Sequence, residues 1–175
     1  MSNQRRAIAA IGFLLCLFLS SGLIFGAAPP AQASIHAYPD TADRVMYRSL
    51  RSLRDRNDLS WQLVFFDWID RGQIESIHLR IVGFPGLELA RSPLELSART
   101  GQRWQATDVS ATALKTGELP PNAGEFDLAD VIRELQEDTT IDLAFALASG
   151  DRIELTVPIA IVREWRKTIE TSLDV

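Results

Sequence analysis

The chain has 175 residues, of which 46% are hydrophobic, 23% charged and 8% aromatic, and its formal net charge is −5. This composition fits one globular domain and argues against long disordered, collagen-like or polytopic membrane proteins. The single cysteine excludes a disulfide framework and a cysteine-rich zinc site. The acidic balance argues against a general nucleic-acid binder, which needs a basic surface to displace counterions.

The N-terminal segment has the three parts of a secretory signal peptide. Arg5 and Arg6 form a basic start, an uncharged run covers 7–28, and an A-x-A cleavage site ends at Ala33. We therefore expect 1–33 to be a signal peptide that is removed on export.

The same segment allows two other interpretations. An uncharged run over 7–28 is long enough to span a bilayer of ~30 Å as a helix, so it could remain as an anchor. Lipidation at Cys16 is disfavoured, because Leu15 stands where a lipobox needs a small residue. Cleavage would leave 142 residues without cysteine, and loss of two arginines would take the net charge from −5 to −7.

After the signal peptide we expect a flexible start over 34–44 and one β-rich domain over 45–175. The strongest strand, 61–69, reads WQLVFFDWI, and its apolar residues on both faces indicate a central strand covered on two sides. The turn at 70–73 contains a glycine and leads into a second strand over 74–82, so these segments predict a hairpin.

Further strands follow along the chain. Weaker strands are expected within 87–98 and over 103–109, and a loop over 115–125. The alternating pattern predicts a second hairpin from 141–148 and 152–157, joined by a Ser-Gly-Asp turn.

Two helices are expected in the C-terminal half. Asp127 is predicted to cap a short helix that ends at Leu135, with Asp130 completing a capping box. Pro158 is predicted to begin a C-terminal helix. Its apolar stripe contains Ile161, Val162, Trp165, Ile169 and Leu173, and the residues expected to face water are Arg163, Glu164, Arg166, Lys167 and Glu170.

The segment 42–55 is ambiguous between helix and strand. Ala42, Met46, Leu50 and Leu53 fall on a helical stripe. The same run precedes a polar turn and the strongest strand, so it could be the first arm of a hairpin. The expected fold class is mainly β: an antiparallel sandwich or half-open barrel of about seven strands, with a short helix and a C-terminal helix. The alternative is an α+β fold with an N-terminal helix.

Several short motifs occur in a fixed order along the mature chain: VMYRSLRSLRD, WQLVFF, SIHLRIVGFPG, LPPNAGEFDL and VPIAIVREW. Together they resemble a family of small exported cyanobacterial proteins known as domain of unknown function 3122. The resemblance covers about 45–165 and implies a thylakoid lumen or periplasmic location. Members often have a glycine-containing turn between the LRD and WQ motifs, which favours a strand over 45–55, although this chain lacks that glycine. The resemblance supplies no catalytic residues.

Signatures of catalysis are missing from the sequence. There is no G-x-S-x-G elbow, no G-x-G-x-x-G and no P-loop, and we expect no cofactor. His36 and His78 are too far apart in sequence to make a strong zinc pair, and a structural role is expected for His78. Asp67, Asp70 and Glu75 could perform acid–base work or bind calcium, but solvated shoulders of a turn explain them better.

The arginines form the clearest candidate site. Five arginines lie within thirteen residues and enclose a single acid: Arg44, Arg48, Arg51, Arg54 and Arg56. As a partner-binding hypothesis, they would dock an acidic protein surface or anionic headgroups through guanidinium forks. The alternative is a solvated face with local pairs to nearby aspartates. The tryptophans Trp61, Trp68, Trp104 and Trp165 could line a ligand pocket, although such residues more often fill a core.

From these observations we expect a non-enzymatic exported accessory or scaffold protein. Its partner would be a thylakoid or plasma-membrane protein complex, bound from the lumenal or periplasmic side and without nucleic acid. One alternative is a carrier of a small apolar ligand, such as a pigment, quinone or lipid. A carboxylate-based hydrolase is a further alternative.

Overall fold

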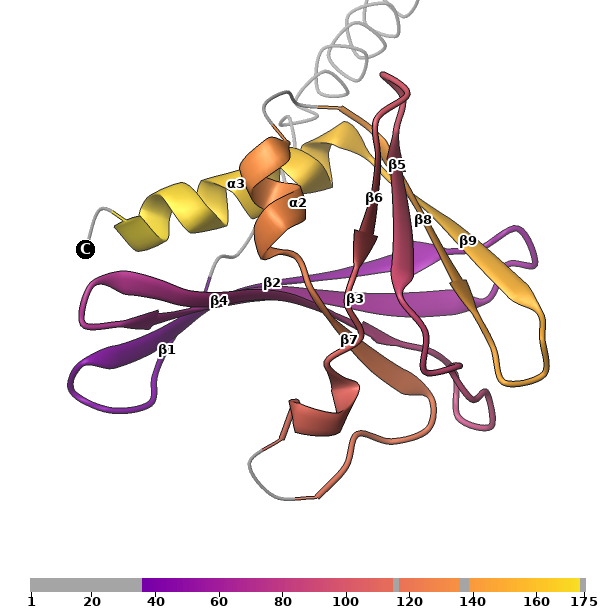
Figure 1. Cartoon of the computed structure of the whole chain (residues 1–175), viewed down its shortest axis with the longest axis horizontal. Coiled ribbons are helices and arrows are strands. Elements are labelled where there is room, and N and C mark those ends of the chain that lie inside the picture. Colours follow the sequence, from indigo (N-terminus) through magenta and orange to yellow (C-terminus); the bar gives the residue numbers. More distant parts are fainter. Residues whose placement is uncertain (1–35, 115–116, 136–138, 174–175) are drawn as a thin grey trace, which may run out of the picture. The chain divides into compact units, whose positions relative to one another are not determined.

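The computed structural model describes residues 36–114, 117–135 and 139–173. The expected signal peptide, 1–33, lies outside these residues. The strands form two antiparallel sheets (Figure 1). The five-stranded sheet has the order β1-β2-β3-β4-β7: β1 (His36–Pro39), β2 (Arg44–Arg54), β3 (Ser60–Asp70), β4 (Gln73–Val82) and β7 (Ala123–Asp127). The four-stranded sheet has the order β6-β5-β8-β9: β5 (Leu94–Ala98), β6 (Arg103–Ala106), β8 (Ile141–Ala146) and β9 (Arg152–Val157).

The mainly β fold class is therefore confirmed, with more strands than expected. The nine strands of the described residues include β1, which lies within the segment 34–44, and β7, whose first residues fall in the predicted loop over 115–125. Both are short strands that pair with longer neighbours, β1 with β2 and β7 with β4. Such segments carry too few residues to show an alternating pattern.

Segment 44–54 forms strand β2, so the alternative with an N-terminal helix is wrong. It pairs with β3 along its whole length, from Arg44 opposite Asp70 to Arg54 opposite Ser60. Because side chains alternate along a strand, Met46 and Leu50 share one face, although their spacing also suits a helix. Pairing with the strongest strand overrides the local helical period.

The two sheets are joined along one edge. After β6 the chain leaves β5 and runs beside β7, where Asp108 forms a β-bridge with Phe126. The N–H of Val109 donates to the carbonyl of Glu125 at 2.8 Å, and the N–H of Asp127 donates to Thr107 at 3.0 Å. Within the described residues the sheets do not close into a barrel, which fits the expected half-open arrangement.

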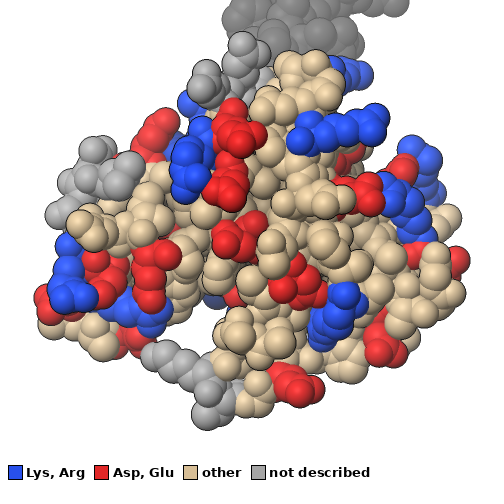
Figure 2. Space-filling model, viewed as in Figure 1, with Lys and Arg blue, Asp and Glu red and all other residues tan. Residues whose placement is uncertain are grey.

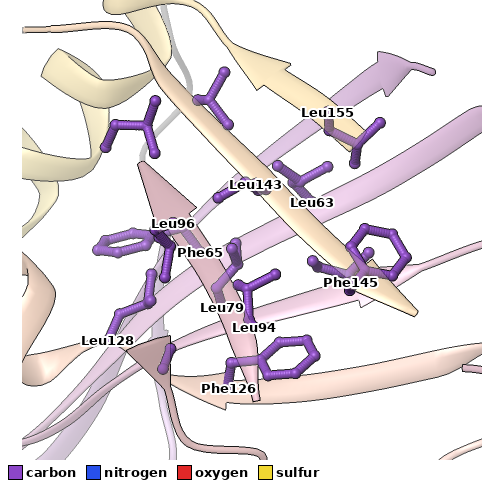
Figure 3. Packing of buried hydrophobic residues seen from close by; sticks show 14 of the residues in the cluster. Leu63, Phe65, Leu79, Leu94, Leu96, Phe126, Leu128, Leu143, Phe145 and Leu155 are labelled. Atoms are coloured by element: carbon purple, nitrogen blue, oxygen red, sulfur yellow. The ribbon is translucent and has the colours of Figure 1, made fainter. Parts of the chain in front are cut away.

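The core fills the space between the sheets. Leucines from both sheets meet there, with Leu63 and Leu79 on one side and Leu94 and Leu143 on the other (Figure 3). We call the side of the five-stranded sheet that faces this core and the C-terminal helix its inner face, and the opposite side its outer face.

Trp61 packs closely against the chain just after β4. A Cβ at Gly83 would collide with the indole ring, which explains the glycine.

The helices follow the prediction in position but differ in detail. Helix α2 (Ala129–Glu134) begins after Leu128, whose side chain makes no cap; Asp127 accepts a hydrogen bond from the N–H of Ala129 at 2.9 Å. The predicted capping box, with Asp127 as the cap, is therefore wrong by one residue. A short 3-10 turn, η1 (Ser110–Thr112), precedes β7. Helix α3 (Ile159–Leu173) begins after Pro158 as predicted and packs on β2, β3 and β4 (Figure 1).

Candidate interaction surface and buried polar clusters

The outer face of the five-stranded sheet carries apolar side chains that remain in contact with solvent. Tyr38 is 38% exposed and Leu50 47%, and Met46, Val64 and Trp68 are half-buried. The sequence predicted cover on both faces of β3, but α3 and the core lie against the inner face only (Figure 1). Exposed apolar side chains grouped on one sheet face are typical of an interaction surface.

Arginines stack on the aromatic rings of this outer face. The guanidinium carbon of Arg44 lies 4.0 Å from the ring centroid of Trp68, and that of Arg48 lies 4.3 Å from the centroid of Tyr38. Such cation–π contacts hold the side chains flat on the sheet. They therefore present planar guanidinium groups beside apolar surface.

The five arginines of the predicted site do not form one patch. Strand alternation puts Arg44, Arg48 and Arg54 on the outer side of β2 and Arg51 on the inner side, while Arg56 lies in the turn that follows. The face seen in Figure 2 likewise shows acidic and basic side chains side by side.

Most of these arginines already have carboxylate partners. Arg44 contacts Glu75 at 2.8 Å and Asp40 at 3.2 Å. The other pairs are Arg51 with Glu164, Arg54 with Asp58 and Arg56 with Glu154. Arg48 differs, because in the described part of the chain it contacts Tyr38, through the phenolic oxygen, 2.5 Å away, and through the ring. Of the five, Arg48 is therefore the arginine without a carboxylate partner among the described residues.

The tryptophans do not line a common space. Trp61 and Trp165 are buried in the core, where Trp61 meets Phe145 edge-on and Trp165 stacks on Phe65, with ring centroids 5.1 Å apart. Trp68 lies on the outer face, and the Trp104 indole donates to Glu134 at 2.8 Å. These positions fit side-chain packing rather than a shared ligand pocket.

The carboxylates Asp67, Asp70 and Glu75 do not converge either. Glu75 is exposed and bound to Arg44, and Asp70 ends β3 beside Arg71. Asp67 was expected on a solvated shoulder, and this is wrong: it is fully buried. The cause is α3, which covers the inner face of β3 at this position.

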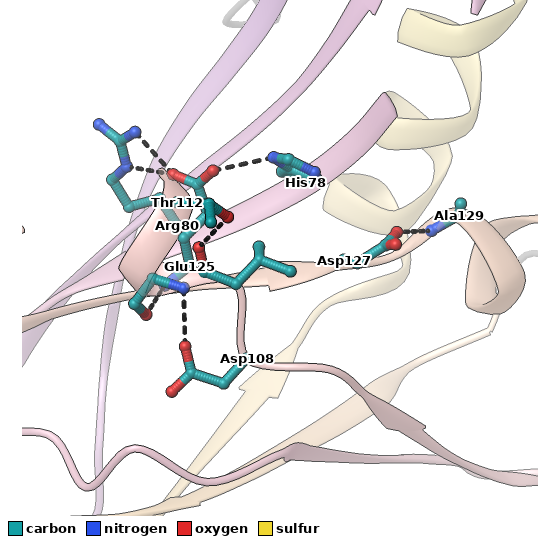
Figure 4. Close-up of polar contacts among 9 residues, drawn as sticks. His78, Arg80, Asp108, Thr112, Glu125, Asp127 and Ala129 are labelled. Carbon is teal, nitrogen blue, oxygen red and sulfur yellow. Dashed lines mark hydrogen bonds and ion pairs between the residues drawn. The ribbon is translucent and has the colours of Figure 1, made fainter. Parts of the chain in front are cut away.

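A buried cluster that sequence reasoning missed lies on the outer face at β4 and β7. Glu125 is only 2% exposed; Arg80 donates to one of its carboxylate oxygens at 2.8 Å, and Nδ1 of His78 lies 2.8 Å from the other (Figure 4). The backbone N–H of Glu125 donates to the hydroxyl of Ser110 at 2.9 Å, so the chain after Asp108 covers the carboxylate. His78 thus has the hydrogen-bonded structural role that was expected.

A second missed feature is a polar seam beneath α3, defined by Ser49, Arg51, Asp67, Glu164, Thr168 and Ser172. Ser49 donates to Glu164 at 2.5 Å, and Arg51 donates to the other oxygen of Glu164 at 2.9 Å. The expectation that Glu164 faces water is therefore wrong. The i, i+4, i+8 spacing of Glu164, Thr168 and Ser172 beside the apolar stripe was the signal that could have found the seam.

Within the seam, Asp67 has no cationic partner. One carboxylate oxygen contacts the Ser172 hydroxyl, and the other has no hydrogen-bond partner among the described residues. Burial raises the pKa of Asp67 to about 6 from an ordinary value of 3.8, and the Ser172 hydrogen bond opposes this only in part.

The face of the four-stranded sheet that points away from the core is hollowed into an open groove of about 1010 Å³. Arg152 crosses it to reach Glu95 at 2.7 Å, and Arg56 reaches Glu154 at 2.8 Å. Thr156 donates to Asp142 at 2.6 Å on its floor. Because these carboxylates already have partners, the groove has the chemistry of a solvated sheet face.

Two further features are absent from the described residues. No helix there is long and apolar enough to cross a membrane. In the same ranges, no three or more His, Cys, Asp or Glu residues are grouped as metal ligands.

These features define a small two-sheet antiparallel β domain with polar clusters on both faces of its larger sheet. Residues 33–168 match the model of the family described as Protein of unknown function (DUF3122), and the chain belongs to this family. No curated protein and no solved structure matches the chain.

Proposed function

We propose that this protein is an exported, non-enzymatic accessory protein of cyanobacteria, which binds a membrane protein complex from the thylakoid lumen or the periplasm. The signal-peptide pattern of 1–33 supports export, and the family resemblance supports the source and compartment. The candidate carboxylates have separate partners, with Asp67 buried against Ser172 and Asp70 and Glu75 paired with arginines, which favours action through a surface rather than hydrolysis.

The observation that carries the proposal is the outer face of the five-stranded sheet. Apolar Leu50, Met46 and Val64 remain open to solvent beside Arg48, which has no carboxylate contact among the described residues. A protein surface that offers apolar side chains around one Asp or Glu would cover this face and pair with Arg48. Because the chain is acidic as a whole, such a partner would be directed to this face rather than to the rest of the surface.

The test is affinity purification of the full chain, tagged at its C-terminus and expressed in its host. Arg48→Glu would place like charges in contact and should reduce recovery of the bound complex by about tenfold or more. Leu50→Ser should reduce it less, through lost apolar contact. Arg103→Glu is the matched control, since it makes the same charge change at an exposed position on the other sheet and should leave recovery unchanged.

Equal recovery of the complex by the Arg48→Glu and Arg103→Glu variants would contradict the use of this face. Failure of the wild-type chain to recover any specific complex would contradict the accessory function itself.

Export of the protein has its own test. The N-terminus of the purified protein should be Ser34, and an intact N-terminus in the cytosol would overturn the proposed export.

A further inference from the structure

The carboxyl group of Asp67 lies in an unusual environment for an aspartate. It projects from the inner face of β3 and is 0% exposed. Its Oδ2 contacts the hydroxyl of Ser172, in the last turn of α3, and its Oδ1 has no hydrogen-bond partner among the described residues. A buried carboxylate with one hydroxyl neighbour and one empty oxygen is costly when ionised.

The number of hydrogen atoms that Ser172 can donate is a second observation about the protonation state of Asp67. A serine hydroxyl has one hydrogen to donate, yet Ser172 Oγ lies 2.8 Å from the carbonyl oxygen of Thr168 as well as in contact with Asp67. The carbonyl can only accept, and one hydroxyl hydrogen cannot serve both contacts at once. Both contacts are hydrogen bonds together when Ser172 donates to Thr168 and a protonated Asp67 donates to Ser172.

The charged groups near Asp67 do not compensate a negative charge on it. Glu164 and Arg51 lie along the same seam, but they pair with each other. Tyr47, opposite Asp67 on β2, contributes a neutral phenol, and β4 contributes Ile77. Among the other charged residues of α3, Arg163, Lys167 and Glu170 are exposed, whereas Arg166 is half-buried on the flank away from Glu164.

We propose that Asp67 is a protonated carboxylic acid in the closed fold, and that it acts as a pH-sensitive latch that holds the last turns of α3 on the sheet. In the closed state Asp67 donates to Ser172 and Ser172 donates to Thr168, so each hydrogen has an acceptor. Ionisation removes the Asp67 proton and leaves a buried charge that can accept from Ser172 only if Ser172 gives up its bond to Thr168, and water relieves this charge by entering beneath the helix end. Burial raises the pKa of Asp67 to about 6, so the carboxyl group changes its charge between mildly acidic and neutral pH.

Opening is confined to the end of the helix because the first part is held independently. Trp165 stacks on Phe65, and Glu164 is fixed by Ser49 and Arg51. Among the described residues after Thr168, the polar contact with the sheet is the one between Ser172 and Asp67. The latch is therefore closed at acidic pH and loosened near neutral pH, without loss of the core.

Amide hydrogen exchange of the full chain, corrected for the intrinsic effect of pH, tests the latch. Between about pH 5 and pH 7.5, protection of the amides after Thr168 should fall by about tenfold or more relative to those at 159–165. Asp67→Asn cannot ionise and should remove this pH dependence. Glu170→Gln, which neutralises an exposed carboxylate of the same helix, should behave like the wild type.

Protection of the helix end that does not change with pH in the wild-type chain would overturn the proposal. So would a Glu170→Gln variant that loses the pH dependence, because the response would then not be specific to Asp67. A titration of the wild-type carboxyl carbons by NMR needs no variant. The Asp67 signal should titrate well above the exposed aspartates, and a midpoint among theirs would refute the protonated latch.

Discussion

Two buried carboxyl groups of the same sheet are accommodated in opposite ways. Glu125, on the outer face, has Arg80 on one oxygen and His78 near the other. Asp67, on the inner face, contacts a serine hydroxyl, and no cation contacts it within the described part of the chain. A carboxylate removed from water needs either an opposite charge or a proton. On the outer face, Arg80 supplies the opposite charge to Glu125. In the seam beneath α3, Asp67 keeps its proton instead.

The largest effect is expected where the opposite charge is lost. Glu125→Gln keeps the size of the side chain but leaves Arg80 without its anion and replaces one of the two accepting oxygens with an NH2 group. Breaking one partner of a buried ion pair costs about 3–5 kcal/mol, and we expect a loss of about 3 kcal/mol because Arg80 retains some contact with solvent. Urea denaturation of the wild-type and variant proteins measures this difference in the free energy of unfolding.

The matched control for this prediction is Glu75→Gln. It removes the carboxylate partner of Arg44 on the same sheet face, but at an exposed pair, so a loss below about 1 kcal/mol is expected. Equal losses for the two variants would mean that burial does not distinguish them, and the contrast between a paired and a protonated carboxyl would fail.

Asp67 should give an intermediate effect, which appears as a dependence of stability on pH. Its pKa in the folded protein, about 6, lies above the ordinary 3.8, so the folded state binds the proton more tightly than the unfolded state. The contribution of Asp67 to stability is therefore complete below about pH 4 and is lost as the pH rises through about 6. The shift corresponds to a loss on the order of 2–3 kcal/mol.

Unfolding experiments at several pH values, with Asp67→Asn as the reference, isolate this contribution. The wild type should lose stability relative to the variant between about pH 4 and pH 7, and the two curves should run parallel above that range. A difference that grows in the other direction would mean that a cation absent from the described contacts stabilises the ionised form.

Much of the fold could be predicted because its determinants are local. The alternating apolar pattern and the turn at Arg71 and Gly72, both with positive φ, define the β3–β4 hairpin. Pro158 and the apolar stripe after it define α3. In each case the sequence pattern that determines the element lies within the element itself.

The polar clusters could not be predicted because their partners are distant in sequence. Glu125 and His78 are 47 residues apart, and Ser172 and Asp67 are 105 apart. Glu164 lies at the border of the apolar stripe of α3, so the helical pattern alone does not decide whether it faces water or β2. The arginines were found from sequence, but the helix–strand ambiguity of 42–55 hid the alternation that separates Arg51 from Arg48.

Glu164 has a cation beside one oxygen and a serine hydroxyl beside the other, and the loss of its hydroxyl partner should give the smallest effect. Its carboxylate accepts from Arg51 on one oxygen and from the Ser49 hydroxyl on the other. Ser49→Ala removes the hydroxyl and leaves the cation, so we expect a loss of only about 1 kcal/mol in urea denaturation. Ser52→Ala, at an exposed position of the same strand, should be close to neutral. A loss at Ser49 as large as that of Glu125→Gln would show that the hydroxyl, not the cation, keeps Glu164 buried, and the same would then apply to any carboxyl group along the seam.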